Sequence, residues 1–145
     1  MIDHIFSLIC NSSVIDSETN TVSIHNILEK LTVFTNSENL AINLPIQFEV
    51  FSDWTRTDEN IPTRGRLRVG LRTPTNENRK LSELEIDLTT VTYYRTRIRA
   101  IGIQLTGPGR YKIEIEFQQE NTSKWKKVAS LPMLVVYRKP EPDAK

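Results

Sequence analysis

The stretch RYKIEIEF, residues Arg110–Phe117, decides the fold class of this 145-residue chain. Apolar side chains at its odd positions alternate with charged side chains at its even positions. A period of two places one row of a β-strand against a core and the other row in solvent, whereas the faces of a helix repeat every 3.6 residues. The stretch therefore predicts a half-buried strand.

The same alternation returns along the chain, and turn-forming polar, glycine or proline residues separate the runs. Short strands separated by such regularly spaced turns are typical of β-sandwiches and β-barrels. We therefore predict an all-β fold, an antiparallel β-sandwich of about seven to nine strands, Ig-like or C2-like in general shape. The expected strands are residues 5–15, 21–34, 46–54, 65–72, 83–88, 92–105, 110–117 and 128–137.

Four segments need a more specific interpretation. In residues 92–105 the apolar positions change parity, which predicts a bulge or bend near Ala100–Gly102. Pro132 cannot donate to a strand ladder, so it favours an edge position or a bulge for the last strand. Residues 26–31 fit a helical turn or a strand equally well. Gly107-Pro-Gly109 predicts a hairpin turn.

Size and composition favour one domain over residues 1–138, followed by a flexible tail over residues 139–145. The formal net charge is +1 and the pI is about 7.9, so the molecule as a whole has no strong field that attracts polyanions. Cys10 is the only cysteine, and His4 and His25 are the only histidines. This excludes an intrachain disulfide and makes a metal site unexpected, and we predict no cofactor.

The first ten residues, MIDHIFSLIC, lack the basic start and the small-residue cleavage site of a signal peptide. No window approaches the roughly 20 apolar residues that cross a bilayer. We therefore expect a cytoplasmic protein that has no membrane partner.

Several short motifs carry a resemblance to a known family. They are Cys10 in an early strand, the segment Ser23-Ile-His-Asn-Ile-Leu-Glu29, Leu44-Pro45 before a strand, Gly109-Arg-Tyr111, and Leu131-Pro132 leading into Leu134-Val-Val136. Together they resemble the DUF6941-type domains of bacteria over most of the chain, although the polar insertion around residues 55–63 is longer than that pattern has. The resemblance implies a bacterial, intracellular β-sandwich and implies no activity.

The candidate catalytic groups have simpler structural explanations. Glu83 and Glu85 lie about 6.6 Å apart on one strand face, a spacing that two acid/base carboxylates can use. A solvated face that pairs with arginines of the next strand explains them better. The serines, histidines and aspartates lack a nucleophile motif, Gly107-Pro-Gly109 precedes a strand rather than a phosphate-binding helix, and Cys10 fits a small buried apolar residue. We predict that the chain is not an enzyme.

Charge is segregated along the sequence. Residues 1–63 hold nine acids and two cations, whereas residues 64–112 hold eleven cations and four acids. If the arginines at alternate positions share one sheet face, they could follow a phosphate backbone while a tyrosine stacks on a base. The alternative is that the arginine rows cover an exposed sheet and pair with acidic rows of neighbouring strands or of the N-terminal half. The candidate binding residues are Arg66, Arg68, Tyr93, Arg95, Arg97 and Arg99.

These observations predict a non-enzymatic binding module that presents a sheet edge, a loop end or a charged face to another protein. It would act as an interaction domain or assembly subunit of a bacterial intracellular system. The alternative is recognition of nucleic acid or another polyanion by the arginine face. A pI far below 9 disfavours that alternative.

Overall fold

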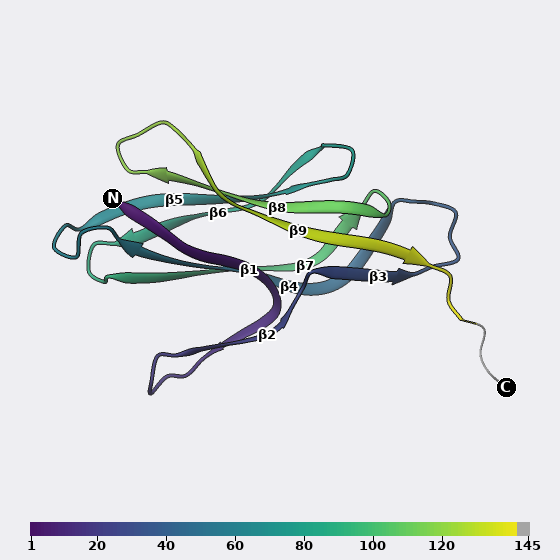
Figure 1. The fold of residues 1–145 in the computed structure, drawn as a ribbon, viewed down its shortest axis with the longest axis horizontal. Coiled ribbons are helices and arrows are strands. Elements are labelled where there is room, and N and C mark those ends of the chain that lie inside the picture. Colours follow the sequence, from purple (N-terminus) through teal and green to yellow (C-terminus); the bar gives the residue numbers. More distant parts are fainter. Residues whose placement is uncertain (142–145) are drawn as a thin grey trace.

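A computed structural model describes residues 1–141 of the chain. In these residues nine β-strands form two sheets, and no helix is present (Figure 1). The strands are β1 (Ile2–Ile15), β2 (Val22–Ile27), β3 (Lys30–Phe34), β4 (Ile42–Arg56), β5 (Thr63–Arg72), β6 (Asn78–Leu88), β7 (Tyr93–Leu105), β8 (Gly109–Gln119) and β9 (Lys126–Arg138). The prediction of an all-β sandwich is confirmed.

The first sheet has the order β2-β1-β4-β7, and the second has the order β3-β9-β8-β5-β6. All pairs are antiparallel except β3 with β9, which is parallel. The single strand expected over residues 21–34 is in fact two strands, β2 and β3, which belong to different sheets. Asn26 has a φ of 55°, and this left-handed conformation redirects the chain just before it crosses between the sheets.

The core lies between the sheets and is built by the alternating residues of each strand. From β8 the residues Tyr111, Ile113 and Ile115 are fully buried, as the alternation predicts. Trp54 of β4 packs on Phe117 of β8 with ring centroids 5.7 Å apart, so the two sheets share this contact. Its indole Nε1 donates to Thr96 Oγ1 at 3.0 Å. Each such large side chain stabilises the fold by about 1.5–3 kcal/mol relative to exposure.

The segment Gly107-Pro-Gly109 does not form the predicted hairpin, because β7 and β8 lie in different sheets. It carries the chain across the sandwich. The Tyr111 hydroxyl donates to the Gly107 carbonyl oxygen at 2.7 Å and accepts from the Thr106 N–H at 3.0 Å, which fixes the crossing. At Gly109, φ is 141° and a Cβ would lie 2.8 Å from Pro74 Cγ, so a larger residue does not fit.

The predicted irregularity near Ala100–Gly102 is confirmed. Ile98 and Ile103 are both buried although their positions differ in parity, and Gly102 between them has a φ of 87°. The extra residue, however, lies on the partner strand. Leu44 pairs with Ile103 and Gln47 pairs with Ile101, so two residues of β4 face one residue of β7.

Pro132 lies where β9 is an edge. The pairing of β9 with β3 begins only at Leu134, so residues 126–133 have β8 as their one hydrogen-bonded neighbour strand among the described residues. This confirms the edge prediction for Pro132. Lys139, Pro140 and Glu141 follow β9 without regular structure, and the rest of the predicted tail, residues 142–145, lies outside the described residues. Within residues 1–141 there is no helix long and apolar enough to cross a membrane.

Candidate functional site

The structure divides the predicted arginine cluster between two surfaces. Arg66 and Arg68 lie on β5 of the second sheet, whereas Arg95, Arg97 and Arg99 lie on β7 of the first sheet. On each strand the residues between the arginines are buried, so both sets point outward from opposite faces of the sandwich. The hypothesis of one shared arginine face is therefore wrong. Alternation tells which side chains point outward, but it does not tell which sheet carries the strand.

The arginines of the second sheet pair with acids of neighbouring strands. Arg66 Nη2 lies 2.9 Å from Glu83 Oε1 on β6. Arg68 donates to both carboxylate oxygens of Glu116 on β8, at 3.1 and 3.2 Å, and its guanidinium lies 4.3 Å from the centre of the Trp125 ring. A hydrogen bond from Lys80 and the nearby arginines lower the pKa of Glu83. The predicted pairing of Glu83 with arginines of the next strand is confirmed.

The arginines of the first sheet stand in rows with residues of β4 and β1. The rows are fixed by strand register, because directly opposite residues share a face. Read across β1, β4 and β7, the three rows are Phe6–Asp53–Arg95, Leu8–Phe51–Arg97 and Cys10–Glu49–Arg99. The rings of Phe6 in the first row and Phe51 in the second row stack with their centroids 5.7 Å apart.

Glu49 is the buried charge of this face, with a side chain only 2% exposed. Arg99 Nε donates to its Oε1 at 3.1 Å. Its Oε2 accepts from the Ser13 hydroxyl and from the Cys10 thiol, the latter at 3.7 Å. Burial and the Glu49 charge raise the pKa of Cys10 to about 11, so the thiol stays protonated at neutral pH. Both carboxylate oxygens of Glu49 are therefore hydrogen-bonded within the fold.

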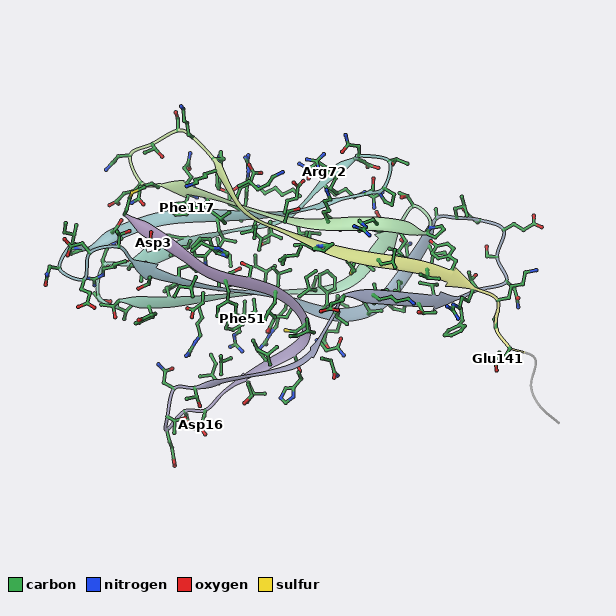
Figure 2. The ribbon with its side chains drawn as sticks, in the orientation of Figure 1. Asp3, Asp16, Phe51, Arg72, Phe117 and Glu141 are labelled. Atoms are coloured by element: carbon green, nitrogen blue, oxygen red, sulfur yellow. The ribbon has the colours of Figure 1, made fainter. Side chains whose placement is uncertain are left out.

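Beyond Cys10, β1 leaves β4 and forms with β2 a two-stranded hairpin that extends away from the sandwich (Figure 1). Asp16 marks its tip, away from the sheets that carry Phe51 and Phe117 (Figure 2). Arg95 fastens the hairpin, because its Nη1 and Nη2 donate to the side-chain and backbone oxygens of Asn20 at 3.0 and 2.6 Å. Arg97 Nη1 adds two weak contacts of 3.4 Å to Ser13. The predicted pairing with acids of the N-terminal half is confirmed for Arg99, which meets Glu49, whereas Arg95 and Arg97 bind neutral oxygens of that half.

Tyr93 is the first residue of β7 and lies at the end of the sandwich where β1 begins, because Asp3 of β1 and Tyr93 are both opposite Thr55 of β4. Its side chain is 66% exposed. Two connections meet there, residues 57–62 between β4 and β5 and residues 89–92 between β6 and β7. Each presents one exposed apolar side chain, Ile61 and Val91 respectively. We refer to Ile61, Val91 and Tyr93 as the loop-end surface.

Arg56 holds the two connections together. Its Nε donates to the Val91 carbonyl oxygen at 3.0 Å, and its Nη1 donates to the Glu59 carbonyl oxygen at 2.6 Å. Thr55 Oγ1 also donates to the Thr92 carbonyl oxygen, at 2.8 Å. These bonds fix the backbone around the apolar side chains, so the surface is ordered before any partner arrives.

An open hollow of about 520 Å³ adjoins the loop-end surface. It is lined by Ile15, Asn20, Asp87, Thr90, Val91, Tyr93, Tyr94 and Arg95. Asn20 and Ile15 belong to the hairpin, so the hairpin forms one wall of the hollow. Of the predicted site residues, Tyr93 and Arg95 meet here. Sequence reasoning missed Ile61 and Val91, although isolated apolar residues inside polar connections were the available signal.

Among residues 1–141, no group of three or more His, Cys, Asp or Glu side chains is arranged to hold a metal ion. Comparison of the sequence with models of protein families gives no match, and comparison with curated proteins gives none either.

Proposed function

We propose that this chain is a non-enzymatic protein-binding module and that it contacts its partner through the loop-end surface. The observation that carries the proposal is that exposed Val91 and Tyr93 line one hollow, on backbone that Arg56 ties to the connection carrying exposed Ile61. Tyrosine is enriched at protein interfaces, where its large ring gives contact area at a low cost in side-chain entropy. A surface that is already ordered loses less conformational entropy on binding. From the family resemblance we propose a bacterial intracellular setting.

The polyanion alternative has less support. Arg95 and Arg99 already donate to Asn20 and Glu49, and Arg66 and Arg68 already pair with acids on the opposite face. A phosphate would have to replace these bonds, and the five predicted arginines are divided between opposite faces, so they cannot follow one nucleic-acid backbone together. Exposed apolar side chains next to a tyrosine favour a protein partner instead.

Photo-crosslinking tests the proposal in cells that contain the full chain. The photoreactive residue p-benzoylphenylalanine replaces Tyr93 in one variant and Ile101 in the control. Ile101 is a matched position, because it is also on β7, is also exposed, and is 84% accessible. We expect a discrete, nuclease-resistant protein adduct from position 93 and none of that size from position 101. The same adducts from both positions, or none from position 93, would contradict the proposal.

A further inference from the structure

The charges around the loop-end surface point to the chemistry of the partner. We propose that this surface binds a protein segment in which Lys or Arg residues flank an apolar side chain. The inference rests on the proposed function and specifies the kind of partner that the module takes.

Carboxylates surround the apolar side chains. Asp58 and Glu59 precede Ile61 in the same connection, and Asp87 lines the hollow beside Tyr93. Asp3 stands in the strand row of Tyr93, because both residues are opposite Thr55 of β4. The hairpin turn, whose Asn20 lines the hollow and donates to the Asp16 carbonyl oxygen, also carries the carboxylates of Asp16 and Glu18.

These carboxylates are only partly neutralised by their own molecule. In the described part of the chain, the ion pair at this end is that of Asp87 with Arg64, at 3.6 Å. Arg56, Arg95 and the Met1 ammonium also lie at this end, and both arginines keep their positive charge although they donate to carbonyl and amide oxygens. The six carboxylates therefore exceed the four cations by two, so the end keeps a small excess of negative charge although the whole molecule carries a formal charge of +1.

The turns keep two of these groups ionised. Backbone N–H groups of Glu18 and Thr19 lower the pKa of Asp16, and the hydroxyl and N–H of Thr89 lower the pKa of Asp87. Asp58 Oδ1 accepts from the Asn60 N–H at 2.9 Å, which fixes this carboxylate on its turn. All three carboxylates are placed before binding, and Asp16 and Asp87 stay charged at neutral pH.

This pattern of an apolar centre with an acidic rim selects one type of partner. An apolar side chain is buried against Val91 and Tyr93, and Lys or Arg on either side meets the rim. A guanidinium or ammonium group is also attracted to the face of the Tyr93 ring. Nucleic acids and acidic segments are repelled by the same rim, so charge complementarity separates the possible occupants.

Selection from a display library of random short peptides tests this inference on the full-length chain. We expect the enriched peptides to carry Lys or Arg around one apolar residue. Titration of the best synthetic peptide should show affinity at least about tenfold lower for Tyr93→Ala. The double variant Asp58→Asn/Glu59→Gln should bind more weakly and with a smaller salt dependence. Glu38→Gln/Glu141→Gln, which neutralises two exposed acids at the opposite end of the sandwich, beyond the paired residues Phe34 and Arg138, is the control and should bind as the wild type does.

Enrichment of acidic or uncharged peptides overturns the inference, and so does a selection that enriches no peptide. The inference is also overturned if Tyr93→Ala binds the best peptide as tightly as the wild type does. Circular dichroism of each variant checks that the fold is retained. The crosslinking experiment separates the two proposals. An adduct at position 93 together with enrichment of uncharged or acidic peptides would contradict the basic partner but support the proposed binding module. Absence of the adduct would contradict the proposed binding module itself.

Discussion

Glu49 lies on the outer face of a sheet, yet its carboxylate is almost fully buried. A buried carboxylate is costly unless other groups satisfy its oxygens, and here Arg99, Ser13 and Cys10 do so. Ser13 reaches Glu49 only because β1 turns away from β4 after Cys10. The pairing of this one side chain therefore specifies where β1 bends and where the hairpin begins.

Arg99→Ala should lower the free energy of unfolding by about 2 kcal/mol, because the buried carboxylate loses a charge-assisted hydrogen bond. Arg66→Ala is the matched control. Its pair with Glu83 is exposed on the arginine side, so the loss should stay below about 1 kcal/mol. Urea unfolding at neutral pH, followed by the fluorescence of the buried Trp54, measures both. Equal losses in the two variants would mean that Glu49 is solvated in solution.

Cys10 gives the fold a pH dependence above neutrality. Its pKa is raised from 9.0 to about 11 in the folded chain, so the folded state holds the thiol proton more tightly than the unfolded state does. The resulting stability is complete below about pH 9 and is lost as the pH rises toward about 11. We expect the free energy of unfolding of the wild type to fall more steeply over this window than that of Cys10→Ala. Parallel curves would show that the thiol is exposed.

Among the elements, the β1–β2 hairpin is the part least supported by the core. A two-stranded hairpin alone is marginally stable in water, and Val14 and Ile27 of this one remain exposed. Its attachment to the first sheet depends on polar contacts of Arg95, Arg97 and Glu49. We therefore expect the hairpin to open locally while the two sheets stay packed.

Labelling of Cys10 by a thiol reagent in native buffer should report this opening, because Cys10 lies fully buried at the base of the hairpin. Arg95→Ala/Arg97→Ala should raise the labelling rate about tenfold, which corresponds to about 1.4 kcal/mol of lost contacts. Arg66→Ala/Arg68→Ala, on the opposite face, should leave the rate unchanged. Far-UV circular dichroism should stay native in both, and it is used here because Arg68→Ala itself changes the surroundings of Trp125. If labelling instead follows the global unfolding rate in every variant, the hairpin does not open separately.

On the scale of the whole molecule, the sequence predicts strands better than it predicts their neighbours. The side chains of Tyr111, Ile113 and Ile115 alternate with charges, and a local period of two is enough to place them inside. Nothing local assigns β2 and β3 to different sheets or makes β3 parallel to β9. The prediction that all the arginines share one face was wrong for the same reason, because a shared face depends on which sheet each strand joins. The sequence singled out Tyr93 as a partner of those arginines, whereas Val91, which lines the same hollow, comes from a loop that lacks a periodic signal.

Reversing the arginine row of the first sheet tests how the whole sandwich depends on it. In the variant Arg95→Glu/Arg97→Glu/Arg99→Glu, the contacts to Asn20 and Ser13 are lost and a new negative charge faces the buried Glu49. We expect the free energy of unfolding to fall by about 3 kcal/mol or more. The control Arg110→Glu/Lys112→Glu/Lys126→Glu changes the net charge equally. Its three residues are exposed and make no ion pair among the described residues, so we expect the free energy of unfolding to fall by only about 0.5 kcal/mol per substitution. Urea unfolding monitored by far-UV circular dichroism compares them. Equal stability of the two variants would mean that Arg95, Arg97 and Arg99 are unpaired surface charges. That result would support anion binding by this row.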